Sequence, residues 1–186
     1  MDIPSRKRTK LKIMVIMLIF QLSGCLTTRI ETTPLPTHFR QLLAANRHPI
    51  QLNCSAEQVS PNLGHQFLFL LLPFGQVVVD DPAAELCRIA KEELALKGFW
   101  ISPAAPESVS LLLQELALSG YDLLLTRRVV VDGLLNATIS YKGRKTEFQT
   151  VIDNGEFRRF AFEKDLREIL QTGLREAIKK LLQELR

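Results

Sequence analysis

The sequence is poor in the residues that most catalytic and metal sites require. It has three His, three Cys and one Trp, and its nine Gly form no phosphate-binding loop, since Gly75, Gly133 and Gly143 occur singly. The serines lack the context of a nucleophile elbow; they include Ser108, Ser110 and Ser119. The sequence therefore predicts a non-catalytic protein without a cofactor or nucleotide site.

Closely spaced metal ligands are also missing. His38, His48 and His65 could form a metal site with Cys54 only if the fold gathered them, because no Cys-x-x-Cys and no His pair at helical spacing is present. We interpret the histidines as solvated loop residues and expect no metal. Asp80-Asp81 is better explained as a helix cap than as a catalytic carboxylate pair.

The sequence also lacks a net charge once its first segment is set aside. The first 24 residues contain five Lys and Arg and one acid, so 19 basic and 19 acidic residues remain after them. The pI of about 9.1 therefore belongs to that segment. A neutral domain gives no support for a nucleic-acid partner.

No apolar run reaches the roughly 20 residues that a membrane-spanning helix needs. The basic first residues are followed by the uncharged run Ile13–Phe20, which is typical of a secretion signal. Leu22-Ser23-Gly24-Cys25 then resembles the bacterial lipobox, in which Leu22, Ser23 and Gly24 would be recognised by the lipoprotein signal peptidase. The alternative is an ordinary secretory signal with a chance cysteine.

The lipobox resemblance implies that Cys25 receives a diacylglycerol and, after cleavage, an acyl chain such as palmitate on its amine. Two or more chains give a stable anchor. Leu26, where an Asp would signal inner-membrane retention, favours the inner leaflet of the outer membrane, facing the periplasm. We expect residues 1–24 to be the signal peptide, 25–37 a lipidated tether, and 38–186 a single periplasmic domain.

Two cysteines remain once Cys25 is lipidated, namely Cys54 and Cys87. The envelope outside the inner membrane is oxidising, which makes a disulfide between them possible. The alternative is two separately buried thiols that behave as small apolar residues. Both interpretations give the pair a structural role.

The apolar patterns predict a mixture of strands and two main helices. Asp81 and Pro82 begin a helix over 82–97, and a 3,4 apolar repeat predicts another from Glu163 to the chain end. Strands are expected in the apolar runs 66–72, 76–79, 99–101, 109–118, 123–141 and 146–152. We expect a hairpin turn at Lys142-Gly143-Arg144-Lys145 and a further turn at Asn154-Gly155. This order predicts an α+β fold: a mostly antiparallel sheet with both helices on one face, in a two-layer sandwich.

The same residues resemble the YajG-like family of uncharacterised outer-membrane lipoproteins. The resemblance covers roughly residues 80–185, through the helix around Leu86–Leu94, its ending at Lys97-Gly98-Phe99, the paired strands and the last helix. It implies the α+β architecture and supplies no catalytic residues.

A tethered binding or scaffolding module with an envelope protein partner is the leading functional hypothesis. Two alternatives are a lipopolysaccharide- or lipid-handling accessory lipoprotein and an accessory subunit of a secretion or flagellar machine. The paired bases Arg127-Arg128 and Arg158-Arg159 could bind acidic head groups, or could be solvated strand ends that discourage edge-to-edge pairing.

Overall fold

The computed structural model describes residues 26–32, 48–56, 58–68, 72–123, 126–158, 163–183 and 185. Cys25, the lipobox residues Leu22, Ser23 and Gly24, and His38 lie outside this part of the chain. In chain order the elements are β1 (Leu26–Ile30), β2 (His48–Ser55), β3 (Asn62–Leu68), β4 (Leu72–Val79), α3 (Pro82–Leu96), β5 (Phe99–Ile101), β6 (Ser108–Leu123), β7 (Thr126–Tyr141), β8 (Arg144–Arg158) and α4 (Glu163–Leu182).

All eight described strands belong to one mixed sheet, so the prediction of a mostly antiparallel sheet was wrong. The pairs β3–β4, β6–β7 and β7–β8 are antiparallel, whereas β1–β4, β2–β5, β2–β6 and β3–β6 are parallel. Local hairpins could be expected from turn residues. The parallel pairs join segments far apart in sequence, and no local signal specifies them.

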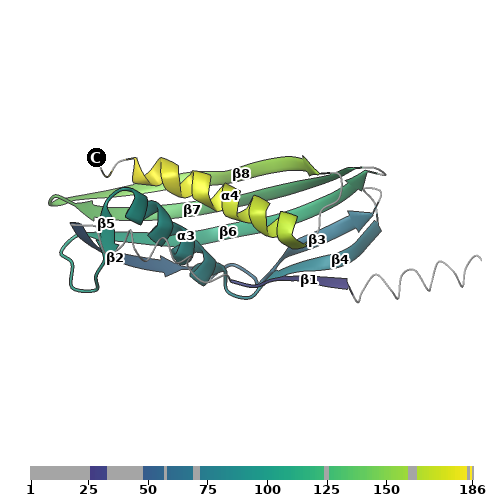
Figure 1. Ribbon diagram of the computed structural model, residues 1–186, viewed down its shortest axis with the longest axis horizontal. Coiled ribbons are helices and arrows are strands. Elements are labelled where there is room, and N and C mark those ends of the chain that lie inside the picture. The colour runs from purple at the N-terminus through teal and green to yellow at the C-terminus, as the bar shows by residue number, and fades with distance from the viewer. Residues whose placement is uncertain are drawn as a thin grey trace, which may run out of the picture.

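Strand β6 organises the sheet (Figure 1). One side of β6 pairs with β7 along almost its whole length, while the other side pairs with β2 near Ser108–Leu112 and with β3 near Gly120–Asp122. The chain thus runs along one side of β6 twice in the same direction. It extends the sheet to β5 at one end and to β4 and β1 at the other.

The start of the expected tether is part of the sheet. Leu26–Ile30 pairs in parallel with Gly75–Val79 of β4, and Ile30 is buried in the core. The interpretation of residues 25–37 as a spacer is therefore wrong for 26–30. Pairing to β4 provides the backbone hydrogen bonds that a free extended segment would give to water.

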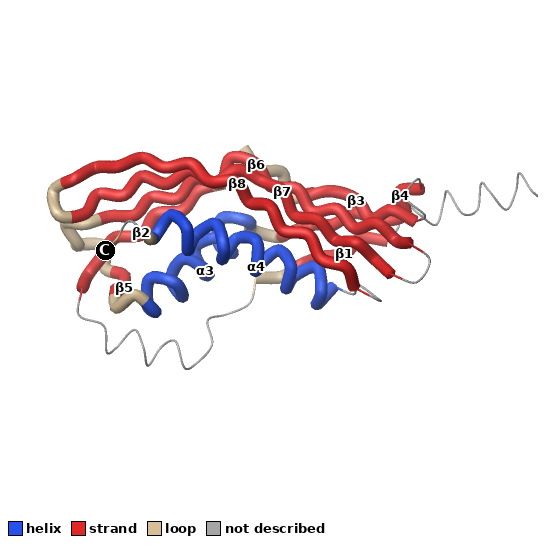
Figure 2. The backbone as a smooth tube through the Cα atoms, turned by 90° about the horizontal axis from the view of Figure 1, so that it is seen from above, coloured by secondary structure: helices blue, strands red, loops and turns tan. Residues whose placement is uncertain are grey.

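Both described helices lie on one face of the curved sheet, which bends around them (Figure 2). Helix α3 begins as predicted: Pro82 is in its first turn, and the Asp81 carboxylate accepts a hydrogen bond from the Ala84 N–H at 2.8 Å. Helix α4 packs on β7 and β8. Its Gly173 allows this approach, since a Cβ there would lie 3.3 Å from Ile152.

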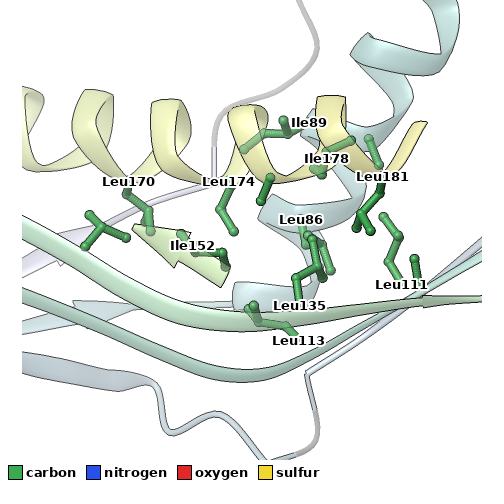
Figure 3. Close-up of a cluster of buried hydrophobic side chains, with 14 of the residues drawn as sticks. Leu86, Ile89, Leu111, Leu113, Leu135, Ile152, Leu170, Leu174, Ile178 and Leu181 are labelled. Atoms are coloured by element: carbon green, nitrogen blue, oxygen red, sulfur yellow. The ribbon is translucent and has the colours of Figure 1, made fainter. Parts of the chain in front are cut away.

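The core fills the space between the helices and this covered face of the sheet (Figure 3). Strands β6, β7 and β8 contribute alternate side chains, and α3 and α4 contribute their apolar stripes. Fully buried members include Leu86, Ile89, Leu111, Leu113, Leu135, Ile152, Leu170, Leu174 and Ile178.

Of the two predicted turns, one is absent and the other is shorter than predicted. The expected turn at Asn154-Gly155 does not occur, because β8 continues through both residues and the Asn154 amide donates to the Ile169 carbonyl of α4 at 3.3 Å. The hairpin turn forms at Lys142-Gly143, with positive φ at both residues, whereas Arg144 and Lys145 already pair with β7 as part of β8.

A bulge at Leu113–Glu115 of β6 brings the Glu115 carbonyl so close to Gly133 of β7 that no Cβ would fit there.

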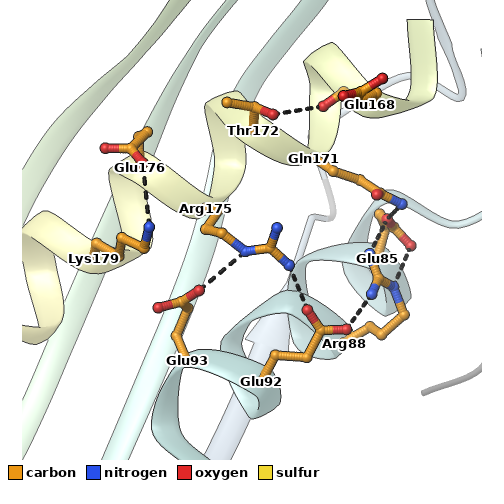
Figure 4. A network of polar contacts seen from close by, with 10 residues as sticks. All are labelled: Glu85, Arg88, Glu92, Glu93, Glu168, Gln171, Thr172, Arg175, Glu176 and Lys179. Carbon is orange, nitrogen blue, oxygen red and sulfur yellow. Dashed lines mark hydrogen bonds and ion pairs between the residues drawn. The ribbon is translucent and has the colours of Figure 1, made fainter. Parts of the chain in front are cut away.

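A buried ion-pair network joins the two helices (Figure 4). Arg88 of α3 binds Glu85 at 2.7 Å and also Glu92, and all three side chains are at most 10% exposed. Arg175 of α4 reaches across to Glu92 and to Glu93, the latter at 3.0 Å. Burial alone would lower the pKa of Arg88, but its hydrogen bonds and attraction to Glu85 and Glu92 leave that pKa above its usual value.

Candidate functional site

No helix covers the face of the sheet opposite α3 and α4 within the described part of the chain (Figure 2). This open face carries a hollow of about 530 Å³. Strands β2, β6, β7 and β8 form its floor. Along each strand, residues that alternate with the core positions point to this open face. The hollow is therefore the reverse side of the best-packed part of the sheet.

Two cross-strand rows build the hollow. The first row runs Asn53, Ser110, Thr138 and Glu147, and the second runs Ser55, Leu112, Asn136 and Gln149. Each row takes one residue from each of the four strands. Neighbouring side chains in a row are about 4.5–5.5 Å apart at Cβ, so the rows present a continuous surface. We call these eight residues the polar trough.

The trough is mostly neutral and holds both donors and acceptors. The Asn53 amide donates to the Ser110 hydroxyl at 3.5 Å. Glu147 is its single acid, 72% exposed and paired with Lys145 at 3.1 Å. Leu112 adds an apolar contact at 36% exposure. Such a surface suits a ligand with amide or hydroxyl groups.

Asn136 is the unusual member of the trough. Its Oδ1 is buried and has no hydrogen-bond partner among the described residues. An unpaired buried carbonyl oxygen costs about 1–3 kcal/mol. Rotation of the Asn136 amide towards the hollow would let an N–H or O–H donor of a partner pair with Oδ1 and would remove this cost on binding.

The serines considered in the sequence lie on β6, where Ser110 belongs to the trough and Ser119 lies opposite Val130 of β7. The Ser110 hydroxyl meets the Asn53 amide, and an amide does not take up a proton near neutral pH. Ser108 lies one row further along the same open face, next to Ser140 of β7. The geometry supports binding through hydrogen bonds.

Cys54 and Cys87 are joined by a disulfide, with their Cα atoms 5.7 Å apart. The bond ties β2 to α3 through the covered face, directly behind the trough that Cys54 helps to line. Of the two alternatives that the sequence left open, the structure has the bonded one. It holds the outer strand of the trough against the helix layer.

The fold does not gather the candidate metal ligands. His48 lies at the start of β2 against Phe99, and His65 lies on β3 against Phe67. Cys54 is in the disulfide. Within the described ranges, no group of three or more His, Cys, Asp or Glu could hold a metal ion.

The remaining predicted polar residues lie apart from the trough. Asp81 caps α3 as expected, and Asp80 pairs with Arg29 of β1. Arg127 and Arg128 lie across from Arg158 and Phe157, respectively, at the other end of the sheet, while Arg159 is outside the described residues.

The sequence alone did not predict the trough, because the two rows of the trough depend on how the four strands are aligned with one another. The alternation of Asn136, Thr138 and Ser140 did indicate a half-exposed strand. Their neighbours on β2 could not be known, since β2 joins β6 through a parallel pairing that spans more than fifty residues of sequence. The run of small polar side chains on β2, namely Asn53 and Ser55, was the available signal.

No family model and no curated protein sequence matches the chain. Among solved structures, a protein from Xanthomonas campestris aligns with 84% of this chain and 91% of its own, at 9% identity and a TM-score of 0.49. Rare lipoprotein B from Shewanella oneidensis aligns with 74% of this chain and 93% of its own, at 16% identity and 0.40. A lipoprotein from Neisseria meningitidis covers 70% and 97%, at 11% identity and 0.32.

Likeness at this level supports no functional inference, and the resemblance to the YajG-like family stays a prediction. In the described part of the chain, no helix has both the length and the apolar character to cross a membrane. The functional argument therefore rests on this chain's own residues.

Proposed function

We propose that this chain is a lipid-anchored lipoprotein of the bacterial envelope whose domain binds an envelope protein through the polar trough. Cys25 is the anchor, in the inner leaflet of the outer membrane, and the domain faces the periplasm. The role is non-catalytic. The unpaired, buried carbonyl of Asn136 within an uncovered hollow is the observation that carries the binding part of the proposal.

The chemistry of the trough favours a protein partner. Backbone N–H and C=O groups of another chain match the mixed donors and acceptors of Asn, Ser, Thr and Gln side chains. The lack of a cationic cluster among the trough residues argues against a strongly acidic ligand at this position. Leu112, in the middle of the second row, would supply an apolar contact for a side chain of the partner.

Lipidation is tested by intact-mass analysis of the protein purified from membranes. We expect a mature chain that begins at Cys25 and carries the added mass of a diacylglycerol and an acyl chain. Cys25→Ala should remain in its uncleaved form without this added mass. An unmodified Cys25 in the membrane fraction would contradict the anchoring.

Binding is tested by photo-crosslinking in intact cells, with a photoreactive residue at Gln149 of the trough. The control carries the same residue at Lys180, which is exposed on α4. We expect Gln149 to capture a defined envelope protein that Lys180 does not capture. The same bands from both positions, or none from Gln149, would contradict a trough-specific partner.

The identity of the captured molecule distinguishes between the functional hypotheses that the sequence left open. Ring proteins would place the chain in a secretion or flagellar machine. Lipopolysaccharide captured from Gln149, in place of protein, would support the lipid-handling role.

A further inference from the structure

Another cross-strand row, separate from the two rows of the trough, crosses the open face at the opposite end of the sheet. Phe67, Tyr121, Arg128 and Phe157 are direct cross-strand neighbours on β3, β6, β7 and β8. The rings of Phe67 and Tyr121 stack at 5.3 Å with an interplanar angle of 9°. The Arg128 guanidinium lies 5.7 Å from the centre of the Phe157 ring. We call these four residues the aromatic row.

The aromatic row is costly to leave in water. Phe157 is 65% exposed, on an edge strand, and is the most exposed of the large apolar side chains in the described residues. Cross-strand pairing explains why the rings and Arg128 contact one another. It does not explain a phenyl group left in solvent at the sheet edge, because that position adds no burial within the domain.

The start of β1 indicates what covers this row. Leu26 begins a cross-strand line that continues through Gly75, Gln66, Gly120, Val129 and Glu156, so it crosses six strands. The aromatic row lies one residue further towards the same end of β3, β6, β7 and β8. The start of β1 and the aromatic row therefore belong to the same end of the sheet, and in the sequence the proposed anchor, Cys25, immediately precedes Leu26.

Strand β1 is paired with β4 from its first residue, Leu26. The chain that follows the proposed anchor at Cys25 therefore enters the sheet without a spacer. Adjacent strands are about 4.8 Å apart. Phe67 lies two strands from β1, at roughly 10 Å, and Phe157 lies five strands away, at roughly 24 Å. A lipid chain on Cys25 would hold the whole row near the bilayer surface.

We infer that the aromatic row rests on the surface of the membrane that holds Cys25, with its rings at the lipid interface and Arg128 at the phosphate groups. This inference rests on the proposed anchoring. Aromatic side chains concentrate at membrane interfaces, and a guanidinium matches a phosphate in charge and geometry. The occupant of this surface is therefore lipid.

Contact through the row also determines where the trough lies. From Tyr121 to Ser110 along β6 is eleven residues, or roughly 36 Å of strand. The long strands would then point away from the bilayer and hold the trough that far into the periplasm, where a partner that does not itself touch the membrane could reach it.

The test uses the single Trp of the chain as an internal control. Trp100 is on β5, which lies at the opposite end of the sheet from β1 (Figure 1), and it is 40% exposed. Full-length lipidated protein is reconstituted into phosphatidylethanolamine and phosphatidylglycerol vesicles with or without brominated acyl chains, which quench Trp only on close approach. The probe variant combines Trp100→Phe with Phe157→Trp.

A matched control combines Trp100→Phe with Val151→Trp. Val151 is on the same strand and the same face as Phe157 and is similarly exposed, at 61%, but it lies six residues, or roughly 20 Å, further from the anchor end. We expect brominated lipid to quench Trp at position 157, while Trp at 151 and the native Trp100 keep their intensity.

Equal intensity with and without bromine at position 157 would overturn the inference, and so would equal quenching at 151 and 157. If Phe157→Trp does not fold, Tyr121→Trp in the Trp100→Phe background tests the same row. The mass of each preparation is measured first. Lipidated protein without quenching refutes membrane contact alone, whereas an unmodified Cys25 refutes the anchoring and this inference together.

Discussion

The two faces of one sheet differ sharply in this protein, as Ile152 and Val151 of β8 show. They are adjacent in sequence, yet Ile152 is 1% exposed against α4 and Val151 is 61% exposed on the open face. The covered face is mostly apolar, with Asn154 and Gln66 among its polar residues. The open face divides into the polar trough and the aromatic row. Packing stability thus resides on one face, which leaves the other free to carry two separate surfaces.

The helices on the covered side are held together by ion pairs as well as by apolar contacts. Glu85, Glu92 and Glu93 are buried, and Arg88 and Arg175 neutralise them (Figure 4). A buried carboxylate without a partner is strongly unfavourable. The covered side therefore depends on specific pairing, whereas we expect the open face to tolerate substitution.

The largest effect is expected from Arg88→Met, which keeps the length of the side chain and removes its charge. Glu85 and Glu92 would lose a partner in a buried site, which should lower the free energy of unfolding by about 3–5 kcal/mol. Urea denaturation measures this. Lys180→Met on the exposed side of α4 is the control and should change little. Similar losses for both variants would show that the network adds no stability.

Ile152 and Val151 are neighbours on β8 that face opposite sides of the sheet. Comparing Ile152→Ala with Val151→Ala therefore tests how much each face contributes to stability. Loss of the buried side chain should lower the free energy of unfolding by about 2–5 kcal/mol, because it leaves a cavity under α4. The exposed change should stay within about 0.5 kcal/mol. A comparable loss for Val151→Ala would mean that the open face is covered in the folded protein.

Removal of the disulfide should have a smaller but clear effect. The bond closes a loop between residues 33 positions apart, and loops of this size give about 2–4 kcal/mol of stability. Cys54→Ala together with Cys87→Ala should lower the midpoint of urea unfolding. Addition of a reductant should lower the midpoint of the parent protein, and it should leave the double variant unaffected.

Apart from the exposed controls, the smallest effect on stability is expected from Asn136→Leu in the trough. The change replaces an unpaired buried carbonyl by an apolar group, so unfolding should change by no more than about 1 kcal/mol. Crosslinking from Gln149 to its partner should be lost at the same time. A partner retained with unchanged yield would exclude Asn136 from the binding surface.

Prediction from sequence succeeded where the signal is local. The bounds of α3 follow from Asp81, Pro82 and Gly98, and the hairpin turn follows from Lys142-Gly143. It failed at Asn154-Gly155, a pair typical of turns, because the Asn154 amide bonds to α4 and the strand pairs with β7 on both sides of it. Tertiary contacts there outweighed local preference.

The candidate site shows the same division. The sequence indicated which residues of β7 face solvent, but it could not show that Asn53 and Ser55 complete their rows. It also gave the segment after Cys25 the composition of a tether, since Thr, Arg and Pro are common in extended spacers. Only pairing with β4 shows that Leu26–Ile30 is a strand.

The sequence by itself predicted a secretion signal and a lipobox at Cys25, and it determined the neutral charge of residues 25–186 and the amphipathic helices. Each of these depends on the residue types themselves or on residues close together in the chain. Tertiary structure decided the mixed sheet, the trough around Asn136, and the placement of Phe157 and Arg128 at the same end of the sheet as Leu26. Strand register brings these residues together across the whole chain, and short-range preferences carry no information about partners that far apart.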